Sequence, residues 1–299
     1  MSFSIKRRKL IKAGAASVLV ASAATVFLES KNAKKLNNVK FDGNANTTTP
    51  IPDKTFEHEL AVKDNLQKVK FFNQTFSDDL FLTKEKYTIF QQALKRILRV
   101  QKVIGYANFN LVSFDDMILY SNRFPQIGRF TKEELALIDE LFFYDANKYG
   151  FYGSKVIKDL TSKVSKKETV KIAGSGHYLF YGDALTKFNQ LKKDVGPDLI
   201  LTSGVRSVVK QLQLFLAKLD ESKGNLSLAS RSLAPPGHSY HGIGDFDVGK
   251  KGFGKLNFTA EFSSTDEYKK LIELKYVDLR YTKDNQVGVR YEPWHIKVV

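Results

Sequence analysis

The side chains of this protein that could carry out chemistry gather in two short stretches near the C-terminal end. Residues 235–249 read PPGHSYHGIGDFDVG, and residues 289–296 read VRYEPWHI. The chain has no cysteine, so a metal site would have to be built from histidine, aspartate and glutamate. Three of the five histidines lie in these stretches; the five are His58, His177, His238, His241 and His295.

The two stretches hold donors suited to a catalytic zinc ion. Such a site has three protein ligands and one open position for water. His241, His295 and one aspartate of the first stretch would supply two imidazoles and a carboxylate. Glu292 would remain unligated beside the bound water, whose pKa zinc lowers to about 7, and would accept its proton. This chemistry suits the hydrolysis of an amide bond.

Three blocks of the chain, in the same order, resemble the VanY-like D-alanyl-D-alanine carboxypeptidases of the LAS family of zinc metallopeptidases. The first block, SGVRS at residues 203–207 followed by Gln211, is similar to the pattern SGxRSxxxQ. The second, PGHSYHGIGDFD at residues 236–247, is similar to PGxSxHxxGxAxD. The third, EPWH at residues 292–295, is similar to ExxH. The resemblance covers roughly residues 170–299, and the ordered combination makes it specific.

The resemblance implies a role for each matching residue. His241, Asp247 and His295 would be the zinc ligands, and Glu292 the general base. Arg206 would hold an oxyanion or the substrate carboxylate, because a guanidinium stays charged and donates in a fixed fork. Ser239 would hydrogen-bond the substrate, as would Gln211, although a polar helix face explains Gln211 equally well. His238 is expected to be a loop histidine near the site rather than a ligand, and His177 to be structural, with the alternative that its glycine-rich loop lines the groove.

The aspartate ligand departs from the family pattern. The family places it seven residues after the first histidine ligand, where this chain has Val248. Asp247 lies six residues after His241 and Asp245 lies four residues after it, which implies a one-residue deletion. We expect Asp247 to be the ligand because an apolar strand residue follows it. Asp245 shares a strand face with Asp247, so it is either a hydrogen-bond partner of the site or the ligand itself.

The elements that must position these residues form an α+β pattern. Helices are predicted at Asp183–Val195 and Ser207–Leu219, and strands at Leu199–Thr202, Asp245–Val248 and Val287–Val299. We therefore expect residues 170–299 to form a zinc peptidase domain, a small antiparallel sheet with flanking helices. This is the LAS-type fold that the resemblance implies.

A helical region of unknown role, residues 56–169, is expected to precede that domain. Apolar residues at helical spacing follow Thr83, a plausible N-cap, and end at Gly105. A second helix opens with the capping-box pattern TKEE at residues 131–134 and is predicted to run to Gly150.

The N-terminal residues are typical of an export signal, assigned to residues 1–28. The basic segment KRRKLIK at residues 6–12 precedes a short apolar run and small residues suited to cleavage after Ala24. Arg7 and Arg8 resemble a twin-arginine signal. A lasting membrane span is not expected, because the run is shorter than the ~20 residues that a bilayer core requires. Residues 29–55 are polar and are predicted to be a linker.

A formal net charge of +15 indicates an anionic partner or a lysine-rich surface. No nucleic-acid-binding motif is present, so we expect no nucleic acid and no stable protein partner, with possible contact between the chain and anionic cell-envelope polymers. The predicted function is removal of the terminal D-amino acid from peptidoglycan stem peptides, in the periplasm or cell envelope. The alternatives are an L,D-carboxypeptidase or endopeptidase of the same fold, and a zinc-containing module that only binds the cell wall.

Overall fold

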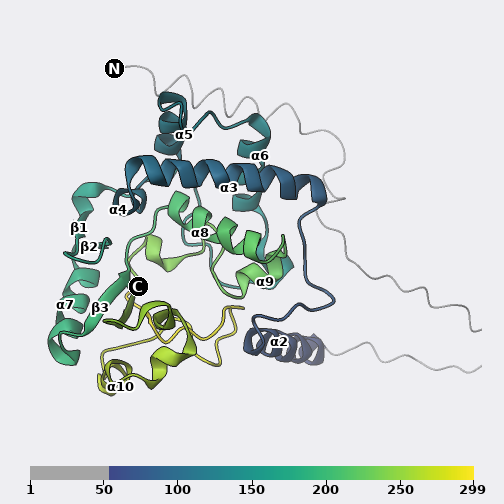
Figure 1. The fold of residues 1–299 in the computed structure, drawn as a ribbon. Helices are drawn as coiled ribbons and strands as arrows, with labels where there is room; N and C mark the ends of the chain where they lie inside the picture. Colours follow the sequence, from purple (N-terminus) through teal and green to yellow (C-terminus); the bar gives the residue numbers. More distant parts are fainter. Residues whose placement is uncertain (1–53) are drawn as a thin grey trace, which may run out of the picture.

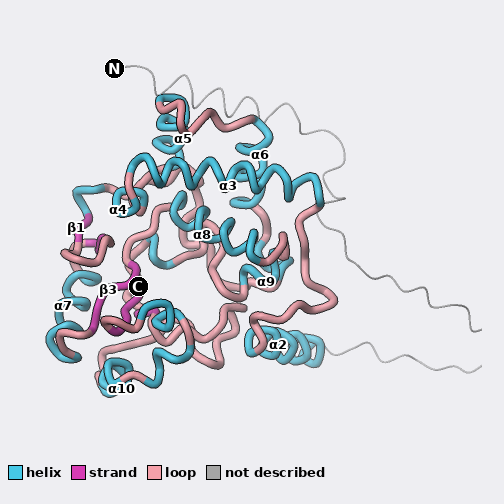
Figure 2. Tube along the Cα trace, viewed as in Figure 1, coloured by secondary structure: helices cyan, strands magenta, loops and turns pink. Residues whose placement is uncertain are grey.

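The computed structural model describes residues 54–299, so the expected export signal and nearly all of the linker lie outside the described residues. Helices dominate, with strands confined to two small sheets (Figure 2). None of the helices within residues 54–299 has the length and apolar character needed to span a membrane. The helices are α2 (Lys54–Lys70), α3 (Lys84–Ile104), α4 (Tyr106–Phe109), α5 (Phe114–Arg123), α6 (Lys132–Phe143), α7 (Asp183–Val195), α8 (Val208–Glu221), α9 (Leu226–Ser230) and α10 (Asp266–Glu273). The strands are β1 (Thr169–Lys171), β2 (Tyr178–Phe180), β3 (Leu199–Ser203), β4 (Phe246–Lys250) and β5 (His295–Ile296).

The helices of the N-terminal region begin at the capping residues expected for them. The Thr83 hydroxyl accepts the amide of Lys86, and α3 ends at Gly105. The capping box of Thr131 and Glu134 is formed at the start of α6. The predicted continuation of that helix to Gly150 is wrong. It ends at Phe143, and a separate 3₁₀ turn follows before Gly150 ends that turn in the left-handed conformation.

Two hydrophobic clusters lie side by side in the molecule. The larger is built on α3, α6, α8 and α9 and includes the fully buried rings of Phe90, Phe142 and Phe215. Figure 1 shows α3 crossing the molecule above α8. The smaller cluster joins α7, the three-stranded sheet and α10, with Phe246 and Trp294 among its members. Helix α8 therefore packs into the core of the N-terminal helices although it lies within residues 170–299 of the chain.

The sheets are antiparallel, so the α+β class expected from the sequence is confirmed. Strands β1 and β2 form one pair, and β3, β4 and β5 form the other sheet in that order. In the second sheet Asp247 lies opposite both Ser203 and His295, next to an irregularity in β3. This register gathers residues from three distant segments at one point.

The long final strand predicted at Val287–Val299 is wrong. Only His295–Ile296 pairs with β4, and the preceding residues form loops and a turn. Pro293 has no amide hydrogen to donate to a ladder, and the amide of His295 instead donates to the carbonyl of Glu292. That turn brings the side chains of Glu292 and His295 to the same place.

Candidate active site

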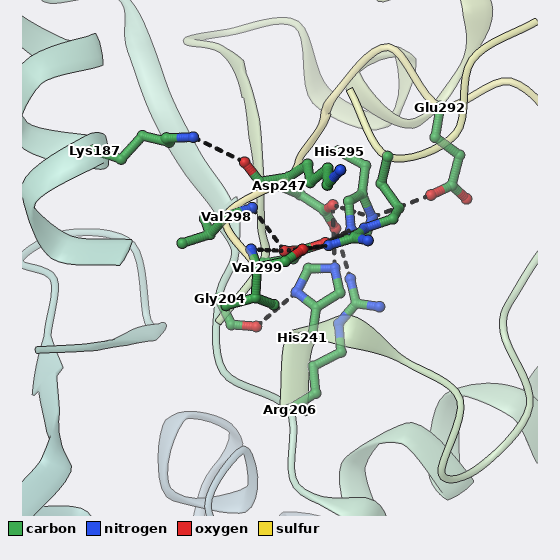
Figure 3. A network of polar contacts seen from close by, with 12 residues as sticks. Lys187, Gly204, Arg206, His241, Asp247, Glu292, His295, Val298 and Val299 are labelled. Carbon is green, nitrogen blue, oxygen red and sulfur yellow. Dashed lines mark hydrogen bonds and ion pairs between the residues drawn. The ribbon is translucent and has the colours of Figure 1, made fainter. Parts of the chain in front are cut away.

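Three expected ligands meet in the structure. The atoms that His241, Asp247 and His295 would offer to a metal all lie within 4.8 Å of one another, and the three residues are buried. Asp247 Oδ1 is 3.2 Å from His241 Nε2 and 3.3 Å from His295 Nδ1. Figure 3 shows both rings directed at the Asp247 carboxylate. The 3₁₀ turn Tyr240–Gly242 carries the first histidine, and β4 and β5 carry the other two residues.

A hydrogen bond to the backbone fixes the orientation of the His241 ring. Its Nδ1 lies 2.8 Å from the carbonyl oxygen of Gly204, which can only accept, so Nδ1 carries the proton and Nε2 presents a lone pair. Burial, and then the charge of Arg206, lower the pKa of His241 to about 4, so the ring is neutral. Gly204 is required here, because a Cβ on it would lie 2.0 Å from the carbonyl oxygen of Tyr178.

Asp245 stands outside the donor set and holds His295 from its other side. Its Oδ2 lies 3.1 Å from His295 Nε2 and accepts from Arg280 Nε at 2.7 Å. The backbone amide of Val298 donates to its Oδ1 at 2.8 Å. Burial would raise the pKa of Asp245, but the hydrogen bonds from His295 and Arg280 lower it well below the ordinary value. Asp247, rather than Asp245, therefore faces both histidines, and Asp245 orients one of them.

The donor set fits a cation. His241 Nε2 and Asp247 Oδ1 are buried and have no hydrogen-bond partner among the described residues, an arrangement that costs free energy without a bound ion. Burial would lower the pKa of His295, but Asp245 and Glu292 raise it to about 9, so this position favours positive charge. A metal ion held by two imidazoles and a carboxylate would take the place of that proton.

Glu292 and Arg206 lie beside the three candidate ligands. Glu292 Oε2 is 3.4 Å from His295 Nδ1, and the glutamate borders the open side of the donor set. The guanidinium of Arg206 donates to Asp247 Oδ2 at 2.6 Å and to the Ser203 hydroxyl at 2.9 Å. Arg206 is thus engaged with a candidate ligand, a contact that its sequence position did not predict.

A cavity of about 510 Å³ opens onto these residues. One wall is a face of α8, where positions three to four residues apart line it, from Lys210 to Glu221. Ser239 and Gln211 line it too, as expected, and so does His177. The side-chain amide of Gln211 donates to the carbonyl of Ala234, while its Oε1 is buried without a partner among the described residues.

The remaining histidines stand apart from the donor set. His238 Nδ1 lies 3.0 Å from the carbonyl oxygen of Gly153, and its ring packs edge-on against Phe151, so it is structural. Burial and the nearby Arg206 lower the pKa of His177 to about 4, and this ring is a neutral part of the cavity wall. His58 lies in α2.

With this geometry in place, comparison with known families identifies the region that holds the site. Residues 181–299 match the family model VanY, described as D-alanyl-D-alanine carboxypeptidase. The chain carries a VanY domain. The match includes β3, β4, β5 and every candidate ligand, and it leaves the N-terminal helices outside.

Several solved structures are similar to part of the chain, and no curated protein matches it. The LdcB LD-carboxypeptidase is 27% identical with a TM-score of 0.34, over 44% of this chain and 63% of that one. The vancomycin resistance D,D-dipeptidase VanXYg is 18% identical with a TM-score of 0.36, over 51% and 65%. The D,D-pentapeptidase VanY of a VanB-type cassette, in complex with Zn(II), is 20% identical with a TM-score of 0.35, over 50% and 88%. This chain therefore spans less than two thirds of the first two proteins.

Several residues around the site of the VanY domain were not predicted from the sequence. Arg280 pairs with Asp245, and the buried ring of Tyr281 packs against His295 with ring centres 4.9 Å apart. Lys210 and Arg290 line the cavity. Arg280 and Tyr281 follow a segment with no clear periodicity, so only the three-dimensional structure reveals their place at the site. Arg290 is two residues from Glu292, and that proximity was the one available signal.

Proposed function

We propose that this protein is a zinc-dependent carboxypeptidase that removes the terminal D-alanine from peptidoglycan stem peptides. The observation that carries the proposal is the convergence of two imidazole nitrogens and one carboxylate oxygen, all buried, beside Glu292 and an open cavity. The description of the VanY family supports a D-alanyl-D-alanine end as the substrate.

His241, Asp247 and His295 would hold the metal, and two imidazoles with one carboxylate are a donor set that zinc accepts. When bound, zinc supplies a Lewis acid and lowers the pKa of water. The Glu292 carboxylate is placed to accept a proton and return it to the departing amine. Asp245 keeps the His295 ring in one orientation.

Three further side chains would position the peptide. Arg206 reaches the cavity as a fork of donors and would bind the terminal carboxylate or the oxyanion. The unpartnered Oε1 of Gln211 would accept an amide hydrogen of the peptide. Ser239, on the same wall, would add a hydroxyl contact.

Digestion of a defined pentapeptide stem, with the products weighed by mass spectrometry, tests this function. We expect loss of one D-alanine in the presence of zinc and no loss after chelation. A tetrapeptide and a cross-linked dimer run in parallel distinguish the L,D-carboxypeptidase and endopeptidase alternatives. Binding of wall fragments with no cleavage of any peptide would contradict the proposal and leave the binding module.

A further inference from the structure

Arg290 is held in the wall of the active-site cavity. Its backbone amide donates to the carbonyl of Arg231 at 2.9 Å, which fixes the position of the residue. Its guanidinium carbon lies over two aromatic rings, 4.8 Å from the centre of Phe72 and 5.0 Å from that of Trp294. Rings on its faces leave the N–H groups at its edges to make hydrogen bonds.

Those edge donors are poorly used by the protein. Within residues 54–299, the one hydrogen bond of the guanidinium runs from Nη2 to the carbonyl oxygen of Phe258, at 3.0 Å. Nε is buried without a partner in the same part of the chain. A guanidinium with most of its donors unused, in a place where burial lowers its pKa, is costly unless an anion approaches it.

The other cavity arginine and one lysine at the same wall have carboxylate partners, whereas Lys210 donates to the amide oxygen of Gln213. Arg206 pairs with Asp247, and Lys218 pairs with Glu221 at 3.0 Å. Arg290 has no carboxylate within ion-pair distance among the described residues, although Glu292 is near enough to influence its pKa. The cavity therefore holds a fixed positive charge that the protein itself does not neutralise.

We propose that Arg290 binds a second carboxylate of the substrate, carried by a residue upstream of the bond that is cut. This inference rests on the proposed function, and of the two roles given there to Arg206 we assign it the terminal carboxylate, because it contacts the candidate ligand Asp247. Arg290 contacts Phe72 and the carbonyl oxygen of Phe258, and it makes no hydrogen bond or ion pair with a candidate ligand among the described residues, so we assign it to a different part of the peptide. The preferred substrate is then a stem peptide with a free internal carboxylate rather than its amide.

A matched pair of peptides tests the assignment. Both end in D-alanyl-D-alanine, and they differ only in whether the internal carboxyl group is free or amidated. We expect the zinc-loaded wild type to prefer the free acid by about 10–100-fold in kcat/KM, the range for hydrogen bonds to charged groups. Arg290→Gln should bring this ratio close to one, and Arg290→Lys should give an intermediate value because it keeps the charge without the fork. Lys218→Gln removes a cation that is already paired and should keep the wild-type ratio.

Binding of the same peptides to the zinc-loaded Glu292→Gln protein, measured by calorimetry, separates this inference from the proposed function. A carboxylate preference in binding with no release of D-alanine by the wild type would refute the carboxypeptidase but retain the subsite. Release of D-alanine from both peptides at equal rates by the wild type would refute the subsite and retain the enzyme. An equal preference in wild type and Arg290→Gln would also overturn the role of Arg290.

Discussion

Two aspartates, two positions apart at the start of β4, have different roles in the metal centre. Asp247 directs one oxygen at both histidines, whereas Asp245 accepts hydrogen bonds from His295 and Arg280 and lies behind the ring. Alternation along the strand predicted that the two would share a face. It could not predict which would face the histidines, because that depends on the pairing of Asp247 with His295 across the sheet.

The two carboxylates should therefore differ in their effect on metal affinity. Asp247→Asn removes a charged ligand and should abolish tight zinc binding. Asp245→Asn should weaken it by about 10–100-fold, the usual effect of a residue that orients a ligand. Competition with a zinc-chelating dye measures both, and the exposed Asp266→Asn serves as control. A metal-free Asp245→Asn protein beside a zinc-loaded Asp247→Asn protein would reverse the assignment.

Glu292 should separate metal binding from turnover. Glu292→Gln keeps the size of the side chain but cannot accept a proton, so D-alanine release should fall by about 10²–10⁴-fold while zinc content stays the same. Arg206→Lys should lower both turnover and peptide affinity, because it loses the planar fork. Release by Glu292→Gln equal to that of the wild type, at matched zinc occupancy, would show that another group takes the proton.

At the scale of elements, the turn between β3 and α8 connects the sheet to the metal centre. Gly204 in this turn supplies the carbonyl that orients His241, and Val205 donates its amide to the carbonyl of Tyr178 at 2.7 Å. The strand and helix on either side were predicted closely, because Ser207 is a clear N-cap and β3 is a compact apolar run. The need for a glycine in the turn comes from β2, a contact that no local pattern reveals.

Gly204→Ala should disturb the metal site, although Gly204 is not one of the candidate ligands. The new Cβ would lie 2.0 Å from a backbone oxygen, so the turn must move, and the carbonyl that holds His241 must move with it. We expect weaker zinc binding together with a lower free energy of unfolding, measured by dye competition and by urea denaturation. Wild-type values for both quantities would mean that the turn relaxes without disturbing His241.

The errors in predicting elements have a common physical origin. Local signals located the start of α3 and both ends of α7, where caps and glycines determine the boundaries. They failed at the end of α6 and in the final strand, where tertiary contacts decide. The strand pattern over Val287–Val299 did not reveal that loops and a turn occupy most of this segment before β5.

At the scale of the whole molecule, the N-terminal segment is joined to the VanY domain by a buried ion pair. Asp79 lies ahead of α3, and its carboxylate accepts two hydrogen bonds from Arg231, at 2.7 and 2.9 Å. The Asn225 amide donates to the same carboxylate at 2.8 Å. Burial would raise the pKa of Asp79, but these hydrogen bonds lower it, so the pair stabilises the fold at neutral pH and is lost only in acid.

Asp79→Asn should test this connection. It leaves the Arg231 guanidinium, with its side chain only 4% exposed, without a charged partner, and we expect a loss of about 3–5 kcal/mol in the free energy of unfolding. Asp78→Asn is the matched control, because that side chain is 65% exposed and its ion pair should contribute about 0–1 kcal/mol. Equal urea midpoints for the two variants would mean that the N-terminal segment is not held through Asp79.

We further propose that the protein acts outside the cytoplasm, on the basis of residues that lie beyond the described part of the chain. Replacing Arg7 and Arg8 by lysines should leave the protein in the cytoplasm, and the mature form should begin near Thr25. Fractionation with N-terminal sequencing checks both. Export that continues after the double change would leave a general signal in place of the twin-arginine one.

The separation in sequence between the residues of the metal centre affects when that centre is completed during synthesis. His295 and its partner Asp245 are 50 residues apart, so β5 can join the sheet only after the segment between them, which includes α10, has been synthesised. The residues of α3 to α8 therefore leave the ribosome before His295 has been synthesised, when the donor set is still incomplete. The metal centre proposed above would therefore be completed only once β5 has paired with β4.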